Sequence, residues 1–143
     1  MRLLKTVPLL LLSLVLLTGC VPPFIACTAI GYGSVARIEL LEPRPGLELA
    51  LCEGGNCTPG PVEMPIEVGA TERPTPTGVF ELTGDSSIGW SAALNSGQPV
   101  LGYRLTDEDG AVVAEGVTAA DWVRVDGTEQ CGGNRLAEVQ LSF

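Results

Sequence analysis

The chain has 143 residues and a formal net charge of −9, with 17 acidic residues against 8 basic ones and no histidine. This length suits one domain with a substantial core. An acidic surface argues against binding to nucleic acid or to anionic lipid headgroups. The lack of histidine excludes catalytic devices that need an imidazole, such as a serine triad.

The first residues have the pattern of an export signal. Arg2 and Lys5 precede an apolar stretch over Val7–Leu17. This stretch is shorter than the roughly 20 residues that a transmembrane helix needs. Its length and its positive flank are typical of a secretory signal peptide. We therefore expect the protein to be exported.

The apolar stretch ends in Leu17-Thr18-Gly19-Cys20, an aliphatic residue and two small residues before a cysteine. This segment resembles the lipobox of bacterial lipoprotein precursors, and the resemblance covers residues 1–20. It implies that residues 1–19 are the signal peptide and that Cys20 receives acyl chains and becomes the first mature residue. The lipid would then hold the protein on the extracytoplasmic face of a bacterial cell membrane. An ordinary signal peptide with an incidental cysteine is the alternative.

After cleavage the chain would divide into two parts. Residues 20–33 would form a lipidated N-terminus and a tether rich in proline, glycine and small residues, and residues 34–143 would form the folded domain. Removing residues 1–19 also removes Arg2 and Lys5, so that six arginines face 17 acidic residues and the charge becomes −11.

Alternation of apolar and polar residues with a period of two recurs through the domain, and glycine-, proline- and asparagine-containing turns separate the repeats. This pattern predicts an all-β fold, an antiparallel two-sheet sandwich of about seven to nine short strands with an immunoglobulin-like architecture. A small β-barrel is the alternative. The alternating segments are 37–40, 47–51, 80–82, 88–94, 101–105, 123–125 and 137–143.

The proline-rich segment 58–78 is less regular, and it allows one edge strand around Val62–Val68. Within it, Val68–Leu82 resembles the stretch that precedes the catalytic half of L,D-transpeptidases, with Thr75-Pro76-Thr77-Gly78 as the matching core. That family uses a cysteine activated by a histidine, and this chain has no histidine. We therefore interpret the core as a turn that precedes a strand.

Four cysteines remain once Cys20 is set aside. An even number outside the cytoplasm predicts two disulfides, with three possible pairings. Cys52 and Cys57 flank a short loop with two glycines, which favours a bridge between them and leaves Cys27 to pair with Cys131. Pairing of Cys27 with Cys52 or Cys57 is the alternative. Because the chain lacks histidine, we predict no metal site and no cofactor.

Three consecutive acidic residues, Asp107, Glu108 and Asp109, raise the question of a calcium site. A calcium loop spaces its ligands at alternate positions, which these residues do not. They lie with Gly110 between two alternating segments, so the sequence predicts a hairpin turn.

The two tryptophans differ in their predicted positions. Trp90 shares the alternation of the apolar residues around it, which predicts a core position. Trp122 is out of phase with Val123 and Val125, so it is expected to face outward as a candidate partner-binding residue.

These observations predict a non-enzymatic, membrane-anchored cell-envelope lipoprotein that presents a disulfide-stabilised β-sandwich for binding or assembly. The expected contacts are the membrane, through the N-terminal lipid, and an envelope protein partner. No catalytic residue and no oligomeric state is predicted. The alternatives are a carboxylate-dependent envelope hydrolase and an accessory structural subunit of an envelope complex.

Overall fold

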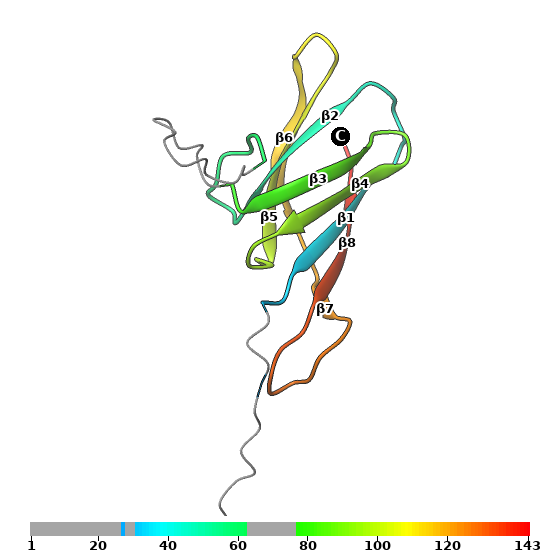
Figure 1. Cartoon of the computed structure of the whole chain (residues 1–143). Coiled ribbons are helices and arrows are strands. Elements are labelled where there is room, and N and C mark those ends of the chain that lie inside the picture. The colour runs from blue at the N-terminus through cyan, green and yellow to red at the C-terminus, as the bar shows by residue number, and fades with distance from the viewer. Residues whose placement is uncertain (1–26, 28–30, 63–76) are drawn as a thin grey trace, which may run out of the picture.

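The structure, a computed structural model, describes residues 27, 31–62 and 77–143 of the chain (Figure 1). These residues form eight strands in two packed sheets, with no closed barrel. The predicted two-sheet sandwich is therefore confirmed. The strands are β1 (Ser34–Leu40), β2 (Glu48–Glu53), β3 (Val79–Asp85), β4 (Gly89–Leu94), β5 (Val100–Thr106), β6 (Val112–Ala119), β7 (Val123–Arg124) and β8 (Arg135–Leu141).

The five-stranded sheet has the order β3-β4-β1-β8-β7, and the three-stranded sheet has the order β2-β5-β6. Residues of alternating parity point from each sheet into the space between them, as the period of two predicts. On β1, for example, Ala36 and Ile38 are buried while Arg37 and Glu39 are exposed. The core residues are Ala36, Ile38, Leu40, Leu47, Leu49, Leu51, Val79, Trp90, Ala92, Leu94, Leu101, Leu105, Ala120, Ala137, Val139 and Leu141.

The pairing of β1 with β8 departs from the predicted antiparallel arrangement. These strands run parallel and in continuous register from Ser34 opposite Arg135 to Leu40 opposite Leu141. The other named strand pairs are antiparallel. The alternation of side chains is the same for both directions, so it carries no information about direction. A parallel pair needs a long connection, and here the connection is nearly the whole domain.

Two apolar residues that the alternation assigned to strand faces lie outside the core. Phe80 is the extra residue where the register of β3 on β4 shifts, and half of its surface is exposed. Ile88 belongs to the turn before β4 and is 77% exposed, whereas Trp90 is buried as predicted. A bulge and a tight turn each break the period of two locally.

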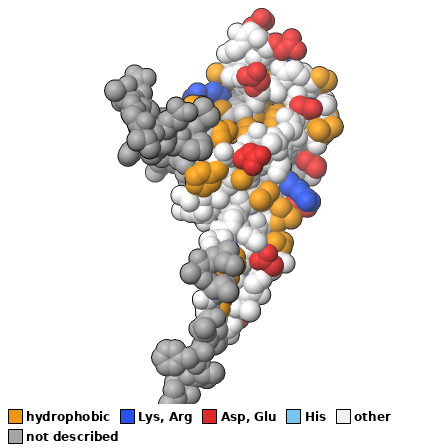
Figure 2. Space-filling view, in the orientation of Figure 1, with side chains coloured by type: hydrophobic (Ala, Val, Ile, Leu, Met, Phe, Trp, Pro, Cys, Tyr) orange, Lys and Arg blue, Asp and Glu red, His pale blue; other side chains and the backbone are white. Residues whose placement is uncertain are grey.

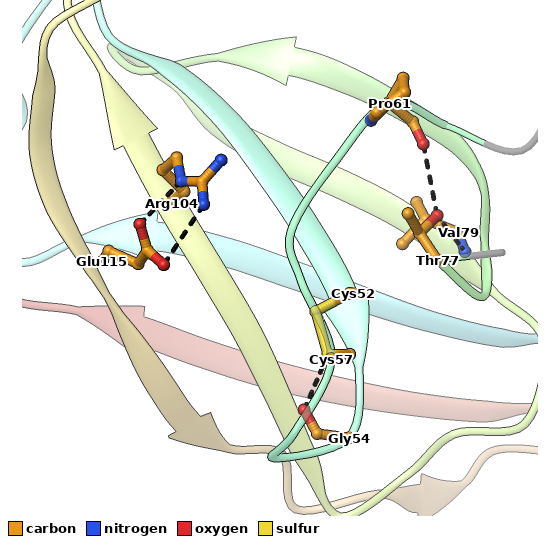
Figure 3. Close-up of a disulfide and its surroundings, with 8 residues drawn as sticks. All are labelled: Cys52, Gly54, Cys57, Pro61, Thr77, Val79, Arg104 and Glu115. Carbon is orange, nitrogen blue, oxygen red and sulfur yellow. Dashed lines mark hydrogen bonds and ion pairs between the residues drawn. A yellow bond between two sulfur atoms is a disulfide. The ribbon is translucent and has the colours of Figure 1, made fainter. Parts of the chain in front are cut away.

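The disulfides join Cys27 to Cys131 and Cys52 to Cys57, the pairing that the spacing favoured. Cys52 follows the core residue Leu51, so it faces the outer side of its sheet. It lies opposite Gly102 on the neighbouring strand β5. The short bridge therefore covers the outer face of the three-stranded sheet (Figure 3).

Some predicted features lie outside the described residues. They include the signal peptide, Cys20, and the edge strand around Val62–Val68 except for Val62 itself. Of the predicted turn before β3, Thr77 and Gly78 are described, and Gly78 has a positive φ, which suits glycine. Within the described part of the chain, no helix has the length and apolar character required to cross a membrane.

We expect the two disulfides to differ in their contribution to stability. In the chain-entropy model, a bridge that closes about 100 residues contributes about 4.7 kcal/mol, and the contribution falls as the closed loop shortens. Cys27 and Cys131 are 104 residues apart, and Cys52 and Cys57 are 5 apart. Urea unfolding should therefore show a larger loss for Cys27→Ser/Cys131→Ser than for Cys52→Ser/Cys57→Ser. Equal losses would contradict an origin in loop length.

Gly102 is required by the disulfide beside it. A Cβ atom at this position would lie 2.8 Å from Cys52 Sγ and 3.1 Å from Cys57 Sγ. Gly102→Val should therefore reduce the free energy of unfolding by about 1–3 kcal/mol through overpacking. The penalty should shrink in a Cys52→Ala/Cys57→Ala background, and an unchanged penalty would show that the sulfur atoms are not its cause.

As a control for this experiment, Gly55→Ala changes a glycine in the same loop. Its added Cβ would meet no atom nearer than 3.8 Å, and its backbone does not have a positive φ. We expect a change within about 0.5 kcal/mol in the same unfolding measurement.

Candidate functional site

One end of the sandwich holds the start of the folded chain, and we call it the tether end. It consists of Cys27, Gly33 and the β7–β8 hairpin, residues 123–136. In Figure 1 this hairpin, drawn in orange, projects beyond the sheets. The Cys27–Cys131 disulfide connects the two segments across 104 residues of sequence.

A hydrogen-bond network fixes the start of β1 to the same hairpin. The backbone N–H of Gly33 donates to Asn134 Oδ1 at 2.8 Å, and the N–H of Arg135 donates to the Gly33 carbonyl at 3.0 Å. The amide of Asn134 in turn donates to Asp126 Oδ2, and its backbone N–H donates to Asp126 Oδ1. The chain is therefore attached to the hairpin at two points, Cys27 and Gly33.

Trp122 does not face outward as the sequence indicated. Its ring is half-buried and packs against the core, and its indole Nε1 donates to the Gln98 carbonyl at 2.7 Å. Instead, Val123 and Val125 are exposed, at 64% and 58% of their surface. The two-residue strand β7 begins at Val123, so Trp122 belongs to the connection between sheets and not to the alternation of β7.

An apolar stripe crosses the outer face of the five-stranded sheet close to the tether end. In register across β4, β1, β8 and β7 lie Ala93, Val35, Leu136 and Val123. Paired positions in a sheet point to the same side. Val123 is largely exposed and the other three are partly exposed, so the stripe is accessible to a partner.

The opposite end, which we call the distal end, is formed by the β1–β2 loop, the β3–β4 turn and the β5–β6 hairpin. Its exposed apolar residues include Leu41, Ile88 and Phe143. The backbone N–H of Leu47 donates to the buried hydroxyl of Ser86, which ties the loop to the turn.

The distal end is strongly acidic, with six carboxylates against one arginine in its loops and adjoining strand ends. Figure 2 shows acidic side chains gathered toward the β5–β6 hairpin. By sequence position, the carboxylates of the distal end are those of Glu42, Glu48, Asp85, Asp107, Glu108 and Asp109, and its arginine is Arg44.

Carboxylates at this end hold its turns. Asp107 Oδ1 accepts hydrogen bonds from the backbone N–H groups of Asp109 and Ala111, so the three acidic residues form the predicted hairpin turn. Asp85 Oδ1 accepts bonds from the hydroxyl and the N–H of Ser87 and from the N–H of Ile88. The Ser87 hydroxyl and N–H are the main reasons that the pKa of Asp85 is lowered, because hydrogen bonds to the ionised form favour it.

A further ion pair lies on the outer face of the three-stranded sheet. Arg104 Nε donates to Glu115 Oε2 at 2.7 Å (Figure 3). This hydrogen bond, with the arginine charge, lowers the pKa of Glu115. The pair therefore adds stability above the unfolded-state pKa of Glu115 and loses it as the pH falls through the lowered pKa. Because both groups are exposed, the effect is small.

A shallow hollow of about 280 Å³ lies on the outer face of the five-stranded sheet, near the β3–β4 turn. Gly84 and Gly89 are among its lining residues. Its charged lining residues are Arg37 and Glu39. Hydrolysis by two carboxylates needs a second acidic group across the substrate, and the hollow provides one carboxylate, Glu39.

Among the described residues, no cluster of three or more His, Cys, Asp or Glu side chains could hold a metal ion. The four cysteines of the described part are bound in disulfides. Comparison of the chain with protein-family models, with curated proteins and with solved structures finds no match.

The contacts of Trp122 predict a structural cost for its replacement. Trp122→Phe keeps an aromatic ring but leaves the Gln98 carbonyl without its donor, so we expect a loss of about 1 kcal/mol in the free energy of unfolding. Val123→Thr, at the exposed neighbouring position, should change it by less than about 0.5 kcal/mol. Urea titration measures both, and equal losses would contradict the packing role of the tryptophan.

Proposed function

We propose that the protein is a lipid-anchored lipoprotein of the bacterial cell envelope, whose small β-sandwich binds or assembles with a protein partner. The observation that carries this proposal is the position of the Cys27–Cys131 disulfide, seven residues after the cysteine of the lipobox-like segment. Disulfides persist outside the cytoplasm, where thiols are not kept reduced. An exported chain with a lipid on Cys20 and an oxidised Cys27 accounts for both features.

The outer surface of the five-stranded sheet supports a binding role. The apolar stripe of Ala93, Val35, Leu136 and Val123 forms a continuous row on a sheet face. Apolar residues that adjoin one another on a surface favour contact with a protein partner over contact with water. Trp122 precedes the stripe residue Val123, and its hydrogen bond to the Gln98 carbonyl holds the connection that leads into β7.

Two of the exposed carboxylates are unsuited to the general-acid role that the alternative, a carboxylate-dependent hydrolase, requires. A general acid needs a raised pKa. The pKa values of Asp85 and Glu115 are both shifted downward by their hydrogen bonds. Such groups stay ionised at neutral pH and serve to hold turns and strands together.

Intact-mass analysis and metabolic labelling with an alkyne fatty acid test the anchor. We expect the mature protein to begin at a diacylglyceryl-modified Cys20 and Cys20→Ala to lose the label. Cys27→Ser should remain labelled and membrane-bound but unfold at lower urea concentration. An unmodified N-terminus downstream of Cys20, or continued labelling of Cys20→Ala, would overturn the proposal.

A further inference from the structure

The length of chain between the lipid and the fold is set by a disulfide. Six residues, Val21–Ala26, separate Cys20 from Cys27. At full extension they span about 20 Å. After Cys27, the next hydrogen bond between the described N-terminal residues and the hairpin is that of Gly33. The twelve residues between Cys20 and Gly33 would span about 40 Å. The bridge to Cys131 therefore halves the distance that the lipid allows between the domain and the membrane.

The short connection ends at one particular part of the molecule. Cys131 lies in the loop of the β7–β8 hairpin, and its backbone N–H donates to the hydroxyl of Thr128 within the same loop. Any lipid on Cys20 must therefore keep this loop near the bilayer surface. The distal end lies at the far ends of β1 and β8, which have seven residues each. Strands of this length extend roughly 23 Å.

The distribution of charge favours the same orientation independently of the tether. The β7–β8 hairpin carries two arginines, Arg124 and Arg135, and two carboxylates, Asp126 and Glu129, so its net charge is zero. The distal end has six carboxylates against one arginine. Anionic lipid headgroups repel the distal end and leave the hairpin unaffected.

The hairpin also presents apolar side chains to its surroundings. Val123 belongs to the apolar stripe on the sheet face, whereas Val125 lies beyond it in the hairpin, and 58% of the surface of Val125 is accessible. Apolar side chains on an otherwise neutral loop partition favourably into the interfacial region of a bilayer. The exposed apolar residues of the distal end lie among its carboxylates, whose charge opposes the same transfer.

We infer that the β7–β8 hairpin is the membrane-facing surface of the domain, with Val125 at the level of the lipid headgroups and the acidic distal end directed away from the bilayer. This inference rests on the proposed lipid anchor at Cys20. It identifies the bilayer surface as the ligand of the hairpin, and it leaves the distal end and the outer face of the five-stranded sheet accessible to proteins.

Energy transfer to the membrane tests the orientation. The full lipidated protein would be reconstituted in vesicles of phosphatidylethanolamine and phosphatidylglycerol that contain a headgroup-labelled acceptor lipid. A donor dye would be attached through an unnatural amino acid at position 125 or, as the matched control, at position 109. We expect severalfold greater transfer from position 125. Equal transfer from both positions, or greater transfer from position 109, would overturn the inference.

A second variant tests the role of the tether while both disulfides remain intact. Six Gly and Ser residues inserted after Ala26 would extend the tether to about 40 Å. We expect a lower transfer from position 125 in this variant, because the hairpin is no longer held at the surface. Unchanged transfer would show that the short tether does not position the hairpin.

The mass of the purified protein, measured before reconstitution, separates this inference from the proposed function. A chain without lipid on Cys20 would refute the anchor. A lipidated chain with equal transfer from positions 125 and 109 would refute the orientation alone and leave the anchor supported.

Discussion

The parallel pairing of β1 with β8 is the contact on which the other features of the fold depend. It places the first and last described strands side by side in the middle of the larger sheet, with β4 on one side and β7 on the other. Ile38 and Val139, opposite each other in this pair, are both buried in the core. The pairing also brings the residues before β1 to the loop before β8, which is why Cys27 reaches Cys131 and Gly33 reaches Asn134.

Because β1 and β8 start at the same end, the molecule has two ends of different character. One holds both covalent and hydrogen-bonded attachments of the N-terminal segment, and its hairpin has no net charge. The other consists of loops whose carboxylates hold their own turns, as Asp85 and Asp107 do. In a membrane-anchored protein with two such ends, the tether end would attach the domain to the bilayer and the distal end would be available to partners.

The sequence was sufficient for those features that depend on local pattern. Alternation predicted the strands other than β6, the Gly-containing acidic turn predicted the β5–β6 hairpin, and cysteine spacing favoured the observed disulfides. The sequence was insufficient for features that the alternation of apolar and polar residues does not encode, and for places where a bulge interrupts that alternation. The direction of β8 leaves no trace in the alternation, and the bulge at Phe80 shifts the register without a Gly or Pro signal. The predicted outward orientation of Trp122 was wrong because Val123 and Val125, from whose positions the core face was inferred, are exposed to solvent.

If the protein is exported as proposed, the order in which its strands cross the membrane affects how the β1–β8 pair forms. In a chain exported with its N-terminus first, β1 would be among the first strands to emerge and β8 the last. The edge of β1 that pairs with β8 would then lack its partner strand until the end of translocation. Cys27 would likewise remain a free thiol until Cys131 emerges. Cys52 and Cys57, five residues apart, face no such delay. In such a chain, the lifetime of that open edge and free thiol would be set by the speed of export.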